Sequence, residues 1–158
     1  MPKTRSKSAN AIDLLKEDHA KVKKAFKEFE NMDRSDTETC RQLIATVCED
    51  LKVHTTLEEE IFYPAVRAAI EDEDIMNEAA VEHETAKMLI DQLENMDADD
   101  PNYYATFSVL GEYVMHHVKE EEGEMFPQAK KAKDLDLEAL GEQIKARKEE
   151  LSAETEQA

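Results

Sequence analysis

The chain contains few of the residues that break helices or build strands. Its 158 residues include three glycines and four prolines, no tryptophan, and no run of β-branched residues. Scarce glycine and proline leave little material for tight turns, and the missing β-branched runs leave few candidate strands. With charged residues at 37%, the composition predicts an all-α protein. The length suits one domain that buries a core without disulfides or structural metals.

Positive charge is also in short supply. Lysine and arginine number 20 against 38 aspartates and glutamates, so the formal net charge is −18. This sign argues against nucleic acid or an anionic membrane as a partner and suits a protein that attracts cations. No apolar run approaches membrane-spanning length. The basic residues 1–9 have no apolar stretch behind them, so we predict a disordered tail in a cytoplasmic protein.

The two cysteines, Cys40 and Cys48, lie eight residues apart on one predicted helix. At about 1.5 Å per residue this spacing separates them by about 12 Å. A disulfide needs Cα atoms within about 7 Å. We therefore expect two ordinary thiols, buried or partly buried, in a reducing compartment.

Four amphipathic helices are predicted from apolar residues that recur at three- and four-residue spacing. Asn10 is placed to cap the first helix, which covers about residues 11–32. Ser35 and Glu38 resemble a capping box for the second, and Pro64 is expected to kink or end it. The third helix is expected over about 74–96, and the fourth begins near residue 101.

The chain beyond the four helices predicts one more. Gly123 and Pro127 are expected to close the fourth helix. The later segment DLDLEALGEQIKARKEEL carries a narrow apolar stripe. We expect a fifth helix lying on the bundle, with a dimerisation or partner surface as the alternative. The predicted divisions are a tail over 1–9, a four-helix bundle over 10–130, and a C-terminal helix and tail over 131–158.

The sequence also repeats itself. Each half contains one histidine, then a His-x-x-x-Glu motif, then a proline. In chain order these residues are His19, His54, Glu58 and Pro64, followed by His83, His117, Glu121 and Pro127. Equivalent residues are 63 or 64 apart, since 117 − 54 = 63 and 83 − 19 = 64. The pattern indicates a duplicated helical hairpin.

The repeated residues make a metal site the favoured interpretation. A histidine and a glutamate four residues apart lie one turn apart on the same helix face, so both reach one point in a bundle core. A single histidine on an apolar stripe is more often an ordinary core residue, but here four occur at equivalent positions. An unpaired buried carboxylate costs several kcal/mol, which metal coordination removes. Four imidazoles and two carboxylates form the ligand set of a two-metal site, and they favour iron or manganese over a softer metal.

His116 needs separate treatment, because Glu120 follows it by four residues as well. The apolar stripe of the fourth helix passes through His117, and the repeat offset also selects His117. We therefore predict that His116 faces solvent or lies just outside the ligands. The neighbouring acidic residues are interpreted as a solvated charged face: Glu59, Glu60, Glu120 and Glu122.

At this point the chain resembles a known family. The order of the six residues and the stretches HTTLEEEIFYP and HVKEEEGEMFP are similar to the hemerythrin-like HHE cation-binding domain, over roughly residues 10–130. The resemblance implies an up-down-up-down four-helix bundle with a non-haem di-iron centre, oxo- or hydroxo-bridged, with manganese or zinc less favoured. It further implies the ligand sets His19 and His54 on one iron, His83 and His117 on the other, and Glu58 and Glu121 as bridges.

One position departs from the pattern of the oxygen-carrying members. Those proteins have a second histidine four residues after the one on the third helix, and this chain has Lys87 there. One iron then lacks a ligand. We expect solvent, Glu82, Glu84 or Tyr113 to complete its coordination shell. An open position lets a metal bind exogenous ligands.

The resemblance and the open position lead to two hypotheses about function. The first is a di-iron protein that binds O₂, peroxide or nitric oxide, with catalase-like decomposition of peroxide as the candidate enzymatic activity. The alternative is an iron or oxygen sensor, or a metal-holding module without turnover, because metal bound by the native state shifts its stability. In either case we expect a monomer or a weak homodimer.

Overall fold

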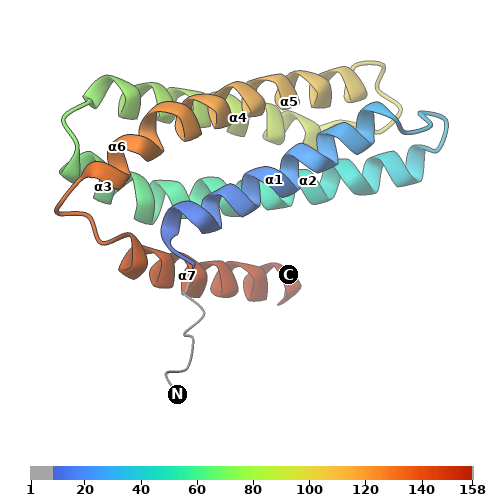
Figure 1. Ribbon diagram of the computed structural model, residues 1–158. Coiled ribbons are helices and arrows are strands. Elements are labelled where there is room, and N and C mark those ends of the chain that lie inside the picture. The colour runs from blue at the N-terminus through green and yellow to red at the C-terminus, as the bar shows by residue number, and fades with distance from the viewer. Residues whose placement is uncertain (1–8, 158) are drawn as a thin grey trace.

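The computed structural model describes the backbone of residues 9–157 and the side chains of residues 9–155. Its core is a four-helix bundle built from two antiparallel hairpins that lie side by side (Figure 1). The hairpins are formed by α1 (Ala11–Glu30) with α2 (Thr37–Leu57), and by α4 (Glu73–Asn95) with α5 (Tyr103–Glu120). The predicted all-α, up-down-up-down bundle is confirmed. The predicted tail, apart from residue 9, lies outside the described residues.

The starts of the first two helices are set by side-chain caps. Asn10 caps α1 as predicted, since its side chain accepts a hydrogen bond of 3.0 Å from the backbone N–H of Asp13. The predicted capping box for α2 is wrong. Asp36 caps that helix instead, because the hydroxyl of Ser35 donates to Asp33 at 2.6 Å.

The prolines do not end their helices, which corrects the prediction that Gly123 and Pro127 close the fourth helix and excludes an end of the second helix at Pro64. The second helix passes through the π turn η1 (Glu58–Phe62) into α3 (Tyr63–Ala69), and the fourth passes through η2 (Glu121–Met125) into α6 (Phe126–Lys131). A proline lacks an N–H, and its ring crowds the carbonyl four residues earlier. A π turn adds one residue and bonds each N–H five residues back, so the helix continues past the proline. Gly123 lies inside η2 rather than at a helix end.

The extra residue in η1 changes which side chains face the core. Phe62 is fully buried, whereas Ile61 is only partly buried. On α2, ahead of the π turn, Ile44 is buried and Leu43 is partly buried. Sequence periodicity assumes an unbroken α-helix, so it misplaces residues after a π turn.

Two apolar clusters fill the bundle on either side of its middle. One lies near the loops that join the helices of each hairpin and includes Phe26, Phe29, Ile44, Leu89 and Phe107. The other lies at the opposite end and includes Ile12, Leu15, Phe62, Met76 and Phe126. Between them is a layer of buried polar side chains. Cys40 and Cys48 are buried and unpaired in the first cluster, as predicted.

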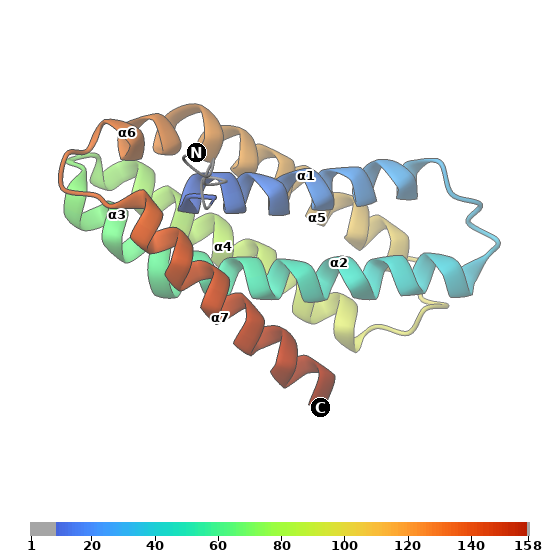
Figure 2. The ribbon, with the colours of Figure 1, turned by 60° about the horizontal axis from the view of Figure 1, so that its bottom comes forward.

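A further helix, α7 (Leu137–Gln157), packs outside the bundle across α1 and α2 (Figure 2). Its buried apolar side chains, Leu140 and Ile144, join the second apolar cluster. The predicted fifth helix on the bundle is therefore confirmed. Within residues 9–157, every helix is too short or too polar to cross a membrane.

Candidate metal centre

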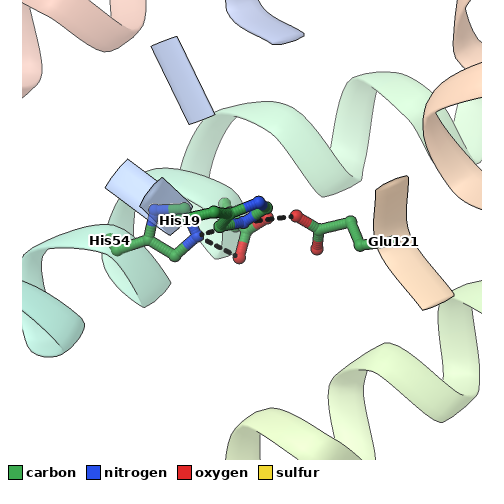
Figure 3. A group of neighbouring side chains, drawn as sticks. His19, His54 and Glu121 are labelled. Carbon is green, nitrogen blue, oxygen red and sulfur yellow. Dashed lines mark hydrogen bonds and ion pairs between the residues drawn. The ribbon is translucent and has the colours of Figure 1, made fainter. Parts of the chain in front are cut away.

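The structure brings all six predicted ligand residues together in the polar layer. One histidine comes from each bundle helix, and each glutamate is the first residue of a π turn. Five of the six residues are at most 6% exposed, and the side chain of His117 is 12% exposed. The side chains of His19, His54 and Glu121 point toward one another (Figure 3).

The first group of ligand atoms surrounds the space between α1 and α2. The Nε2 atoms of His19 and His54 face each other at 3.2 Å. Glu121 Oε1 lies 3.2 Å from His19 Nε2, and Glu58 Oε1 lies 3.1 Å from His54 Nε2. Two nitrogens and two carboxylate oxygens therefore converge on one point.

The second group uses the same two glutamates. Glu58 Oε1 lies 3.1 Å from His83 Nε2, and Glu121 Oε2 lies 3.0 Å from His117 Nε2. In each group the ligand atoms lie within 4.8 Å of one another. Both carboxylates contact both histidine pairs, which is the arrangement that bridging ligands require.

Two buried oxygens make the fit to a metal specific. Among the described side chains, Glu58 Oε2 and Glu121 Oε1 are buried oxygen atoms without a hydrogen bond, although Glu121 Oε1 has its 3.2 Å ion-pair contact with His19 Nε2. A buried polar atom with no partner carries its full desolvation penalty. A cation between the glutamates removes that penalty, so the donor set fits a pair of metal ions.

Each predicted ligand histidine also donates a hydrogen bond from its outward ring N–H to another carboxylate. The Nδ1 to carboxylate distances are 2.7 Å for His19 to Glu122, 2.9 Å for His54 to Asp18, 2.9 Å for His83 to Glu59, and 2.8 Å for His117 to Glu82. A carboxylate on Nδ1–H fixes the tautomer and directs the Nε2 lone pair inward, as metal-bound histidines usually require.

These outer carboxylates correct the predicted charged face. Glu59 and Glu122 bind ligand histidines instead of only facing solvent. The repeat contained the signal, because Asp18 and Glu82 are 64 residues apart and Glu59 and Glu122 are 63 apart. Each of them is the chain neighbour of a ligand residue. Glu60 fits the prediction, because it is 48% exposed.

Tyr63 is the site residue that the sequence prediction missed. Its buried hydroxyl lies 3.2 Å from His83 Nε2 and 3.0 Å from His117 Nε2, and it donates a short hydrogen bond to Glu121 Oε2. The π turn puts Tyr63 over Glu58, since the backbone N–H of Tyr63 bonds to the Glu58 carbonyl five residues earlier. In an unbroken α-helix that place would fall to Phe62.

The side chains expected to complete the coordination shell beside His83 and His117 lie elsewhere. Tyr113 is 46% exposed and Glu84 is 76% exposed, while Glu82 binds the outer nitrogen of His117. The ammonium group of Lys87 contacts Glu59 Oε1 at 2.5 Å. It therefore holds the carboxylate that orients His83.

Comparison with known proteins now decides the family. The model of the hemerythrin HHE cation binding domain matches residues 10–129. This chain belongs to that family. A solved structure similar to this HHE domain is the hemerythrin HHE cation binding domain-containing protein from Mycobacterium kansasii, described as an Rv2633c homolog. It is 26% identical, with a TM-score of 0.78 over 92% of this chain and 89% of that one.

A curated relative of this HHE domain is a protein named DNA nickase from Nostoc sp. strain PCC 7120. It is 29% identical over 117 residues, which are 74% of this chain and 32% of the relative. The chain thus spans about a third of that protein's length. The shared part is the size of the HHE domain itself.

The register of the fourth bundle helix follows the repeat. His117 faces the site, whereas His116 is 62% exposed and pairs with Glu120 at 3.1 Å and Glu82 at 3.5 Å. His116 thus lies just outside the centre and reaches it only through Glu82.

The electrostatics of the HHE site hold protons where a metal would bind. Burial opposes protonation of His54, but Glu58 and Asp18 outweigh it and raise its pKa to about 10. Burial likewise opposes protonation of His117, and hydrogen bonds to Glu121, Glu58 and Glu82 raise its pKa to about 12. Burial and the nearby glutamates raise the pKa of Tyr63 well above its usual value.

A small cavity opens onto the site from the side of the first apolar cluster. It has a volume of about 30 Å³, and its apolar walls are formed by Val22, Leu51, Ala86 and Val114. About 10 to 15 Å³ is enough for one water, whereas pockets for organic ligands measure about 300 to 1,000 Å³. The cavity therefore suits a ligand of two or three non-hydrogen atoms.

Proposed function

We propose that this chain holds two iron ions between its repeats and binds O₂, hydrogen peroxide or nitric oxide there. The observation that carries the proposal is the orientation of the four imidazoles, each with Nδ1 on an outer carboxylate and Nε2 turned toward the two glutamates. Nitrogen and carboxylate donors favour iron or manganese, and a phenol oxygen strengthens the preference for a hard metal. Manganese or zinc is the less favoured occupant.

The ligand roles follow from the distances. His19 and His54 would hold one ion, His83 and His117 the other, with Glu58 and Glu121 shared between them. Tyr63 lies where an additional oxygen ligand would bind on the His83 side. When bound, the iron pair supplies redox chemistry and binding positions for small ligands.

The chain's own residues restrict what reaches the centre. The cavity is small and is lined in part by valine, leucine and alanine, so its size restricts which molecules reach the centre. The second apolar cluster closes the opposite side, where Phe126 stacks on His19 with ring centroids 5.9 Å apart. The small cavity thus gives a ligand one approach to the histidines.

Peroxide decomposition is the enzymatic form of this proposal. Two H₂O₂ molecules give two H₂O and one O₂, one molecule being oxidised and the other reduced, so no external electron donor is needed. Adding peroxide to the iron-loaded protein should release O₂, and His54→Ala should abolish the release. Lys145→Ala, at an exposed position on α7, is the control. Unchanged peroxide with iron-loaded wild type would contradict the enzymatic form.

The alternative is a sensor or metal-holding module whose output is a change in stability. Contacts of α7 with the site region favour it, because Lys148 on α7 contacts Asp18 at 2.5 Å. Metal bound only by the folded state stabilises that state by mass action. Metal-dependent stability without peroxide turnover would support this alternative over the enzyme.

Partners and compartment complete the proposal. We propose a cytoplasmic location, because both cysteines are buried free thiols, which suit a reducing compartment. We also propose a monomer or weak homodimer. Nickase activity is not included, because the net charge of −18 opposes binding to a polyanion. Size-exclusion chromatography with light scattering tests the oligomeric state, and a tight dimer would contradict it.

A further inference from the structure

The outer carboxylates are held in different ways, and among the described side chains one of the four, Asp18, contacts α7. Around His83 and His117, Lys87 on α4 holds Glu59 of η1, and His116 on α5 faces Glu82. Both of these partners belong to the bundle. Asp18 instead accepts from Lys148 on α7, at 2.5 Å to Oδ1, while its Oδ2 accepts from His54 Nδ1 at 2.9 Å. A continuous chain of contacts thus runs from α7 to one metal ligand.

The position of α7 makes this contact possible. Gly141 packs directly on the start of α1, where a Cβ atom would lie 2.7 Å from the Ala9 carbonyl oxygen. Ile144, one turn later, is 1% exposed and buried in the second apolar cluster. Lys148 follows one more turn along the same face. The close packing at Gly141 and Ile144 therefore brings Lys148 to Asp18.

A second contact joins α7 to the surroundings of Glu58, which follows His54 along the second bundle helix. Arg147 donates to Glu60 through Nε at 2.9 Å, and Glu60 belongs to η1, the π turn that begins at the bridging Glu58. Two consecutive residues of α7 thus contact the surroundings of two ligands from one hairpin. The family match ends at residue 129, so α7 lies outside the part of the chain that defines the domain.

From these contacts we infer that Lys148 and Asp18 are positioning residues for His54, and that docking of α7 and metal occupancy of the His19/His54 position stabilise each other. The inference rests on the proposed two-metal site. A carboxylate on the outer nitrogen of a metal-bound histidine orients the ring and strengthens its donor. Coupling between two sites is reciprocal in free energy. Metal should therefore hold α7 in place, and α7 should retain that metal.

The first experiment measures release of ferrous iron from the full chain, loaded with two ions without oxygen, into a coloured chelator. His19→Ala identifies the phase that belongs to the His19/His54 position. We expect Asp18→Asn to speed that phase by roughly ten- to hundredfold, and Lys148→Ala by roughly two- to fivefold, since half-exposed ion pairs are weak. Lys148→Arg should restore it. The other phase should not change.

The control is Lys145→Ala, which removes a lysine of α7 for which no ion pair is found among the described residues. The thermal midpoint of the metal-free protein should be the same in both lysine variants. Equal acceleration of both ions, or a Lys148→Ala rate equal to that of Lys145→Ala, would overturn the coupling alone. A wild-type chain that takes up no iron would overturn the two-metal proposal and the coupling with it.

The reverse direction is tested on the wild type by hydrogen exchange of the α7 amides. We expect slower exchange over residues 137–155 when iron is bound, and a smaller slowing in Asp18→Asn. This measurement does not depend on the folding of Lys148→Ala. Exchange in α7 that is the same with and without iron would overturn the inference.

Discussion

Tyr63 and Phe126 hold the same place in the two repeats, five residues after Glu58 and Glu121, but only Tyr63 brings a hydroxyl group into the site. The phenol lies between His83 and His117, while the ring of Phe126 stacks on His19. The two histidine pairs therefore have unequal surroundings. The His83 and His117 pair has an additional oxygen, from Tyr63, beside it. The His19 and His54 pair is bordered by the apolar ring of Phe126 instead.

The phenol gives the first prediction. Because its pKa is raised well above the usual value, Tyr63 should stay neutral until a ferric ion binds, and iron loading should then produce a visible phenolate-to-iron absorption band. Tyr63→Phe should abolish the band and weaken the His83/His117 ion by at least about tenfold. Tyr113→Phe, at an exposed position, should keep both properties. A band that survives in Tyr63→Phe would show that the phenol is not a ligand.

The shared glutamates give the second prediction. Glu58→Gln keeps the shape of the side chain but removes a charge that faces all four histidines, so it should lose both metals. His19→Ala should lose only one. Metal content after gel filtration measures both outcomes, and Glu124→Gln on the exposed part of η2 is the matched control. Two ions per chain in Glu58→Gln would rule out a bridging role.

The raised histidine pKa values give a prediction about pH. In the metal-free protein His54 and His117, with pKa values of about 10 and about 12, carry protons that a metal must displace. Their contribution to the metal-free fold is complete below the usual histidine pKa of about 6.5 and is lost as the pH rises through the folded values. Because metal displaces more protons at low pH, the gain in thermal midpoint on adding metal should grow from about pH 6 to about pH 9. A gain that shrinks over this range would contradict the prediction.

The cysteines give a prediction about reactivity. Burial and the nearby Glu94 raise the pKa of Cys48 to about 12, so its thiol is protonated at neutral pH, and the thiolate is the reactive form. Cys40 is fully buried. A thiol reagent should label neither residue in the native protein and both in denaturant. Rapid labelling of the native protein would place a cysteine at the surface.

The repeat explains how much of the site the sequence could predict. Six residues were found because each has an equivalent of the same type in the other half, at an offset of 63 or 64. Tyr63 fails that test, since its equivalent is Phe126. The outer carboxylates pass it, but an acidic residue next to a ligand looks the same as the charged surface of a strongly acidic chain.

The fold shows the same division between regular and irregular features. Apolar periodicity predicted the four bundle helices and the stripe of α7, because burial of one face decides those elements. It could not predict the π turns at Glu58 and Glu121, which add one residue without any change in composition. The contact of Lys148 with Asp18 joins residues 130 positions apart, and no local pattern encodes it.

The most direct test of the account is a count of metal ions per chain. Ferrous iron is added to the metal-free protein without oxygen, excess metal is removed by gel filtration, and bound iron is measured against protein concentration. The account predicts saturation at two ions per chain in the wild type and at one in His19→Ala. Saturation of the wild type at one ion, or no retained iron, would contradict the two-metal centre.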